Sequence, residues 1–171
     1  MTASKVRVRQ GRSGDVPALQ AISAEARERY RSLPELSHVA NSTPVAAERF
    51  AIGDVVVAYV DGDGSPLGFA LTRTLDGHLF LDNISVATHA TGRRIGAELL
   101  GHVVRVASEA TLPRVILTTF HRPPWNGPWF RRHGFETMPA ANYGSGLRAI
   151  LSQQAEHFDP TTREVLWCLS R

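Results

Sequence analysis

The chain has 171 residues, of which 43% are hydrophobic and 20% charged, and this balance predicts one globular domain over residues 1–171 with a substantial core. No run of about 18 apolar residues occurs, which argues against a membrane span, and the polar, basic residues 1–8 argue against a signal peptide. A net charge of +3 suits an anionic ligand without indicating nucleic acid. The single Cys168 cannot form an internal disulfide, so a packed thiol in a reducing cytoplasm is expected.

The first half of the chain predicts a strand, two helices and a three-stranded meander. Asp15 is expected to cap the first helix, and Thr43 with Pro44 to begin the second. The two turns of the meander are short enough for antiparallel hairpins. In chain order, we expect a strand over 5–9, a helix over 13–30, a polar loop over 31–43, a helix over 43–51, and strands over 54–60, 66–74 and 78–86, with turns at 61–65 and 75–77.

The second half predicts a β-α-β unit followed by further mixed structure. A helical crossover indicates that the strands 78–86 and 114–120 are parallel. The fold class is therefore α/β (α+β), with a mixed, mostly antiparallel sheet of about 6–7 strands flanked by helices. In chain order, we expect a helix over about 93–110, a strand over 114–120, a short helix over 125–134 that Gly134 stops, a strand over 135–138, a helix over 146–158 and a strand over 163–171.

The loop between the strand 78–86 and the following helix has the character of an anion site. The first turn of a helix presents unpaired N–H groups, which bind phosphate without a special side chain. Gly92 and Gly96 allow close approach, and Arg93 and Arg94 add positive charge. A simple connection with no ligand is the alternative. The pair Arg131-Arg132, beside Gly134, is a second basic cluster that favours an anion site.

Two segments resemble the GCN5-related N-acetyltransferase (GNAT) family. In that family, the loop after the fourth strand has Gln or Arg, two residues, Gly, one residue, then Gly or Ala, and it cradles the pyrophosphate of acetyl-CoA; residues 91–96 match at Gly96. The segment "LTTFHRPPWNGPWFRRHGF" resembles the family's strand, Asn-bearing helix and terminal Gly-Phe. The resemblance implies a β-α-β core that binds acetyl-CoA as co-substrate. The implied contacts are Ile84, Val86, Thr91, Gly92, Arg93, Arg94, Ile95, Gly96, Ala97, Asn126, Trp129 and Phe130, with Asn126 near the pantetheine arm.

Three positions depart from the family's pattern: Thr91 replaces Gln or Arg, Arg94 replaces a glycine, and Phe130 replaces a tyrosine that protonates the leaving thiolate. We expect Arg94 to lie in an already helical first turn, where any L-residue can adopt the backbone. Its side chain then binds phosphate, the alternative being that it occludes the site. Water or Tyr143 is left as the source of the proton that Phe130 cannot give.

The chemistry that the resemblance implies needs a base and a group that polarises the thioester. Asp82 stands where parts of the family have a glutamate base, and it would act through water; pairing with an arginine is the alternative. A backbone N–H near Val86, where a splay between two strands admits the thioester, would polarise the carbonyl. Trp125 and Trp129 flank Asn126 and either wall the channel or pack in the core. Candidates for holding a cationic amine are Glu25, Glu28, Tyr30, Glu35 and His38, the alternative being ordinary surface.

The function expected from these residues is an acyl-CoA-dependent N-acetyltransferase that moves an acetyl group to a primary amine of a small molecule or peptide. The alternative is a catalytically silent acyl-CoA-binding or regulatory domain, which the residues at positions 91, 94 and 130 favour. The seven histidines lack the spacing of metal ligands, so no metal is expected. Neither nucleic acid nor membrane is expected as a partner, and the strand 163–171 could pair with a second copy in a homodimer.

Overall fold

The structure, a computed structural model, describes residues 5–62 and 64–171 in two compact units. The first unit comprises the chain up to Thr72 together with Asn83–His102, and the second comprises Arg73–Asp82 together with Val103–Arg171. Residues 1–4 and residue 63, which belong to the expected basic N-terminus and to the expected turn 61–65, lie outside the described residues.

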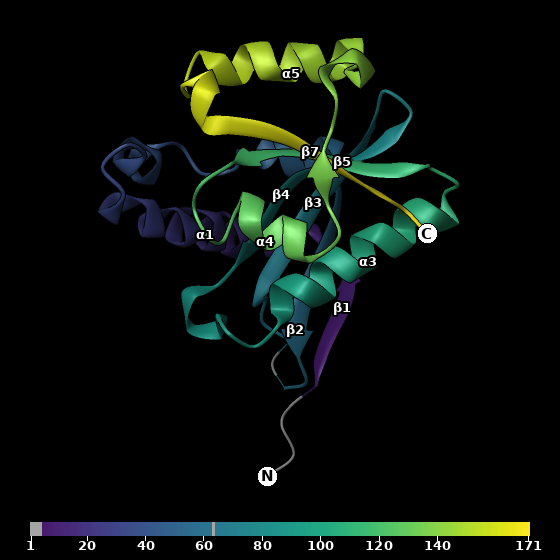
Figure 1. The fold of residues 1–171 in the computed structure, drawn as a ribbon. Coiled ribbons are helices and arrows are strands. Elements are labelled where there is room, and N and C mark those ends of the chain that lie inside the picture. Colours follow the sequence, from purple (N-terminus) through teal and green to yellow (C-terminus); the bar gives the residue numbers. More distant parts are fainter. Residues whose placement is uncertain (1–4, 63) are drawn as a thin grey trace. The chain divides into compact units, whose positions relative to one another are not determined.

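The described elements follow the expected order. Short 3-10 turns separate several of them, including η4 (Thr88–Ala90) after the fourth strand. The helices and strands are β1 (Val6–Gln10), α1 (Val16–Arg27), α2 (Ala47–Ile52), β2 (Asp54–Val60), β3 (Gly68–Leu75), β4 (His78–Val86), α3 (Ile95–Glu109), β5 (Arg114–Phe120), α4 (Gly127–Arg132), β6 (Glu136–Thr137), α5 (Ser145–Ala155) and β7 (Arg163–Leu169) (Figure 1).

Hydrogen bonding connects seven strands of the described chain in the order β1-β2-β3-β4-β5-β7-β6. The pairs β1–β2, β2–β3, β5–β7 and β6–β7 are antiparallel, whereas β4 and β5 are parallel. The mixed, mostly antiparallel sheet that the sequence predicts is therefore confirmed, and so is the parallel pair made by the helical crossover.

In the first unit, β-branched and aromatic side chains of the meander pack together in the core. Val57 and Phe69 face each other in the β2–β3 register and are fully buried. Leu19 and Ile22 are buried on one face of α1. These contacts follow the expected helical and strand periodicities.

In the second unit, a core cluster joins α5 to the sheet. Its buried members are Phe80, Ile116, Met138, Leu147, Val165 and Trp167. Because Met138 and Leu147 lie in the segment between β6 and β7, that segment is part of the core and not a loose loop. Figure 1 shows α5 and α4 on opposite sides of β7.

The turn between β3 and β4 also begins α5. Asp76 and Gly77 both have positive φ, at 50° and 75°, as in a two-residue hairpin turn, within the turn expected at 75–77. The Asp76 carboxylate accepts hydrogen bonds from the amides of Gly146, at 3.0 Å, and Leu147, at 2.8 Å. A Cβ on Gly144 would collide with this carboxylate, so glycine there allows the turn to cap the helix.

Two expected helix starts are wrong. The Asp15 side chain does not cap α1, because its carboxylate accepts from the Arg12 amide at 2.8 Å and pairs with Arg9 at 2.7 Å. The second helix begins at Ala47 and not beside Pro44, because Val45 is fully buried and its amide donates to the hydroxyl of Ser23. At Asp15 a nearby turn takes the carboxylate instead, and at Val45 packing against α1 delays the helix start.

Among the helices that the structure describes, none is both long and apolar enough to cross a bilayer.

Candidate functional site

In the first unit, the start of α3 packs closely against β3. Ile95, the first residue of α3, is 1% exposed. A Cβ on Gly68 would lie 2.8 Å from the Ser85 carbonyl oxygen and 3.2 Å from the Ile95 side chain. The missing side chain at Gly68 therefore allows the start of α3 to pack against β3 and the end of β4. Ile95 can reach a ligand only through its backbone.

The backbone of Arg94 is left-handed, with φ +61°, and Gly92 has φ +83°. The expectation that Arg94 lies within the first helical turn is wrong, because α3 begins one residue later. A positive φ is the conformation that favours glycine, since an L side chain is strained there. Arg94 thus has a backbone conformation that glycine adopts without strain, at a position where the resemblance expects a glycine.

The loop presents amides and positive charge to solvent. The hydrogen bonding of α3 starts with the Glu98 amide, which donates to the Arg94 carbonyl at 3.1 Å, so the amides before Glu98 in this helix have no helical acceptor. Arg93 and Arg94 are exposed, and their guanidinium groups make no hydrogen bond or ion pair with any part of the chain the structure describes. We call residues 91–97 the amide loop. Besides the two arginines, this segment contains Thr91, Gly92, Gly96 and Ala97. Its charge is unneutralised where an anion would bind.

Glu25, an expected ligand for a cationic amine, has another partner. Its carboxylate accepts from the Thr88 amide at 2.8 Å and so supports η4, next to the amide loop. Glu28 pairs with Arg31 at 2.9 Å, and Tyr30 is buried at 9% exposure. Glu35 and His38 are exposed. Three of the five acceptor candidates therefore have structural roles.

Strand β4 carries its polar residues on two faces. The Asn83 side chain accepts from the Ser85 hydroxyl at 2.7 Å, and residues two apart on a strand share a face. Asp82, Ile84 and Val86 lie on the other face and are half-buried. Within the second unit, the parallel ladder joins Leu79 to Val115 and Phe80 to Ile116, both pairs lying before Asp82 along β4.

The short helix α4 follows Asn126, its N-terminal cap residue, and packs through aromatic rings. The Asn126 carbonyl accepts from the Phe130 amide at 3.1 Å. The Phe130 ring is 5% exposed and lies edge-on to Trp129, at 5.0 Å, and to Phe135, at 5.5 Å. Gly134, with φ +89°, ends the helix as expected. Trp129 and Asn126 are half-buried, as is Trp125.

Glu164 is a candidate that the sequence did not single out. It stands in an apolar strand, its side chain is 14% exposed, and it forms an ion pair with Arg131 of α4. Its Oε1 is buried without a hydrogen-bond partner among the described residues, and a Cβ on Gly127 would collide with it. Arg131 also donates to Thr137, and its ion pair with Glu164 neutralises its charge, whereas Arg132 is exposed and, among the described residues, donates only to the Pro124 carbonyl. The signal that the sequence offered for Glu164 was a single acidic residue within an otherwise apolar strand.

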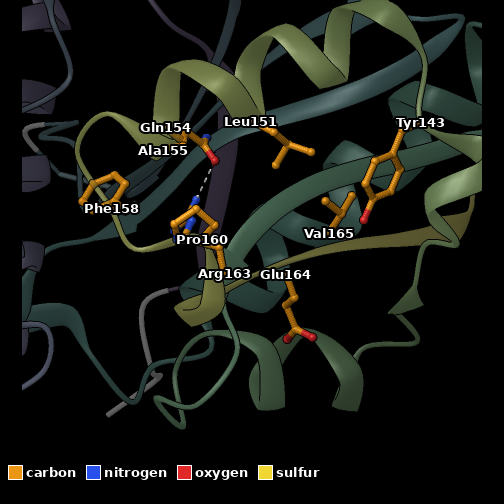
Figure 2. Close-up of a pocket in the computed structure, with 9 residues that line it drawn as sticks. All are labelled: Tyr143, Leu151, Gln154, Ala155, Phe158, Pro160, Arg163, Glu164 and Val165. Carbon is orange, nitrogen blue, oxygen red and sulfur yellow. Dashed lines mark hydrogen bonds between the residues drawn. The ribbon is translucent and has the colours of Figure 1, made fainter.

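A pocket of about 220 Å³ lies between α5 and β7 in the second unit (Figure 2). Its lining residues are Tyr143, Leu151, Gln154, Ala155, Phe158, Pro160, Arg163, Glu164 and Val165. Arg163 donates to Gln154 of α5, whereas Glu164 pairs with Arg131 of α4, so adjacent β7 side chains point to opposite faces. The pocket therefore belongs to the α5 face of β7, and Figure 2 shows the Glu164 carboxylate directed away from it.

Cys168 is packed on β7. It is 7% exposed, and burial raises the pKa of its thiol to about 11. A neutral, packed thiol is what the sequence predicts, and it is a poor nucleophile. In the described parts of the chain, no three His, Cys, Asp or Glu side chains converge as metal ligands.

Comparison with known proteins places these features in a family. A sequence profile described as the acetyltransferase (GNAT) domain matches residues 51–137, slightly more than half of the chain. The profile includes β4, the amide loop, α3, β5 and α4.

Solved structures share the fold at low sequence identity. An acetyltransferase of the GNAT family from Staphylococcus aureus Mu50 superposes with a TM-score of 0.71 at 11% identity, over 98% of this chain and 100% of that one. The PaiA N-acetyltransferase of Thermoplasma acidophilum, in complex with coenzyme A, gives 0.69 at 11% identity, over 96% and 99%. N-acetylglutamate synthase from Neisseria gonorrhoeae, complexed with coenzyme A and N-acetyl-glutamate, gives 0.69 at 18% identity, over 99% of this chain and 36% of that one. The chain thus spans about a third of that synthase's length.

Proposed function

The chain belongs to the GNAT acetyltransferase family, and we propose that it transfers an acetyl group from acetyl-CoA to the amine of a small molecule or peptide. Family membership supports acetyl transfer in general, and the acceptor is part of the proposal. Relatives solved with coenzyme A support acetyl-CoA as the co-substrate.

The observation that carries the proposal is the left-handed backbone at Arg94. A non-glycine residue in this conformation is strained by about 1–3 kcal/mol, and such strain concentrates at ligand clamps. The left-handed backbone at Gly92 and Arg94 shapes the turn that leads into α3, whose first amides have no helical acceptor. The pyrophosphate of acetyl-CoA would accept from those amides and from the guanidinium groups of Arg93 and Arg94.

The remaining coenzyme contacts follow from the family pattern. Asn126, at the start of α4, would bind the pantetheine arm, with Trp129 beside it, and Ile84 and Val86 would line the strand along which the arm lies. Phe130 supports the site by packing, since its buried ring has no proton to give.

The chain's own groups would carry out the transfer as follows. Acetyl-CoA supplies the acetyl group as a thioester. Asp82 would accept a proton from the attacking amine through a water molecule, and the Val86 amide would donate to the thioester oxygen. The new C–N bond forms as the C–S bond breaks, and the departing thiolate would take its proton from water in place of the absent tyrosine.

A second candidate, an acyl-CoA-binding domain without turnover, is favoured by the three departures from the family pattern, of which Phe130 removes the usual acid. One experiment separates the two. The protein is incubated with acetyl-CoA and a broad panel of amines while free thiol release is followed, and its thermal stability is measured with and without acetyl-CoA. Thiol release that depends on an amine supports the transferase. A thermal shift without release on any amine supports the binding domain. The absence of both responses would contradict both candidates. A reducing cytoplasm, suggested by the packed thiol of Cys168, stays a prediction.

A further inference from the structure

The pocket between α5 and β7 has the size of a single ring. An apolar cavity of about 150 Å³ holds benzene, and sites for whole drug-sized ligands begin at about 300 Å³. The pocket, at about 220 Å³, therefore suits an aryl or branched alkyl group and leaves the rest of the ligand outside.

The walls of the pocket are mainly apolar. Leu151 and Ala155 come from α5, Phe158 and Pro160 from the segment after it, and Val165 from β7. Figure 2 shows the Leu151 and Val165 side chains directed toward one another across the space between α5 and β7.

The charge around the pocket excludes a cation from its interior. The carboxylate of Glu164 points toward α4 and is paired with Arg131, whereas Arg163 brings a positive guanidinium to the α5 side. This guanidinium stacks over the rings of Phe120, at 4.4 Å, and Phe158, at 5.3 Å. A protonated amine would gain no counter-charge inside, so the apolar end of a ligand enters and the amine stays at the mouth.

Two polar side chains of the wall are held by hydrogen bonds, and a third offers a hydroxyl that has no partner among the described residues. Gln154 donates to Thr118 at 2.9 Å and accepts from Arg163 at 3.2 Å, which fixes both polar side chains. The Tyr143 hydroxyl makes no hydrogen bond with the described residues, and burial raises the pKa of this phenol, so it stays protonated at neutral pH. It can donate to an oxygen on the bound group.

The β7 residues that line the pocket pair with the C-terminal half of β5. The register places Arg163 beside Phe120, Glu164 beside Thr119 and Val165 beside Thr118. The family pattern implies that the thioester enters between β4 and β5, so a ligand anchored on β7 would lie one strand away from that point of entry.

Resting on the proposed acetyl transfer, we propose that the pocket between α5 and β7 is the acceptor subsite for an apolar group, and that the acceptors are amines bearing an aryl or branched alkyl group rather than polyamines.

The test compares para-fluorophenethylamine with putrescine as acceptors, in the wild type and in two matched variants. Ala155→Trp places a large side chain at an exposed position that lines the pocket, and Ala149→Trp places the same side chain on an exposed position of α5 that does not line it. We expect the aryl amine to have a kcat/KM at least about tenfold above that of putrescine, since even one methylene in a fitted pocket is worth about 10–200-fold. Ala155→Trp should abolish this preference and Ala149→Trp should keep it. Leu151→Ala, which enlarges the pocket, should shift the preference toward a naphthyl amine.

Binding is followed separately by fluorine NMR of para-fluorophenethylamine without acetyl-CoA. Acetylation of both amines at similar kcat/KM, or an equal response of the two tryptophan variants, would overturn the subsite while leaving the transferase intact. Fluorine line broadening that Ala155→Trp removes, in a protein that acetylates nothing, would sustain the pocket and overturn the transferase. No broadening and no turnover would overturn both.

Discussion

Replacing Arg94 by glycine separates the two consequences of its left-handed backbone. A left-handed L-residue is strained by about 1–2 kcal/mol, which a glycine avoids. Glycine loses more conformational entropy on folding, and this offsets about 0.5–1 kcal/mol of the relief. Arg94→Gly should therefore stabilise the fold by about 0.5–1 kcal/mol, or about 1–4 °C in Tm for a chain of this size. The side chain is exposed and without a partner among the described residues, so no folded-state contact offsets the gain.

The same change should weaken coenzyme binding. A hydrogen bond between charged groups is worth about 1.5–3 kcal/mol, and exposure brings it to the lower end. We expect the Kd for acetyl-CoA to rise about tenfold, which corresponds to about 1.4 kcal/mol. Titration calorimetry gives the Kd and differential scanning calorimetry gives the Tm.

Two controls isolate the causes. Arg94→Lys keeps the charge and the strain, so affinity should be largely retained without a gain in Tm. Thr111, at the other end of α3, is also left-handed, with φ +57°, and Thr111→Gly should raise Tm without changing the Kd. A lower Tm together with an unchanged Kd in Arg94→Gly would refute the reasoning, and tighter binding would show that the side chain obstructs the site.

Three further outcomes are expected. Asp82→Asn should lower kcat about 10²-fold or more with an unchanged Kd for acetyl-CoA, as for loss of a general base; stopped thiol release with a matching rise in Kd would contradict the assignment. Asp76→Ala removes the carboxylate that caps α5 through Leu147, and it should destabilise the fold by about 1–2 kcal/mol in urea unfolding; an unchanged midpoint would contradict the cap. The hydrogen bond from Arg9 holds the pKa of the Asp15 carboxyl below its usual value, so this pair stabilises the fold above the unfolded pKa of about 3.9 and is lost as pH falls through the lower folded value. In Asp15→Asn, the free energy of unfolding should fall less steeply with decreasing pH than in the wild type. An equal slope in both proteins would show that the pair does not contribute to stability.

Local patterns predicted the elements that depend on neighbouring residues. The turn expected at 75–77 joins β3 to β4, and Gly134 ended α4 as expected. The β-α-β crossover gave the parallel pair β4–β5, because handedness and strand order leave few alternatives.

Features that depend on distant residues were beyond the sequence. Glu164 meets Arg131 across 33 positions, and no local pattern indicates that pair. The pocket arises because the segment between β6 and β7 folds back as α5, which only the packed structure reveals. The conformation of Arg94 was missed because a basic residue at a helix start reads as the first turn, and its strain is visible only in φ.

Titration of isotope-labelled protein with acetyl-CoA, followed residue by residue in amide NMR spectra, tests the binding of the diphosphate most directly. The largest shifts should fall on the backbone amides of the amide loop, with smaller ones at Asn126. Binding that leaves the amides of residues 92–97 unmoved, or the absence of binding at millimolar acetyl-CoA, would contradict the account.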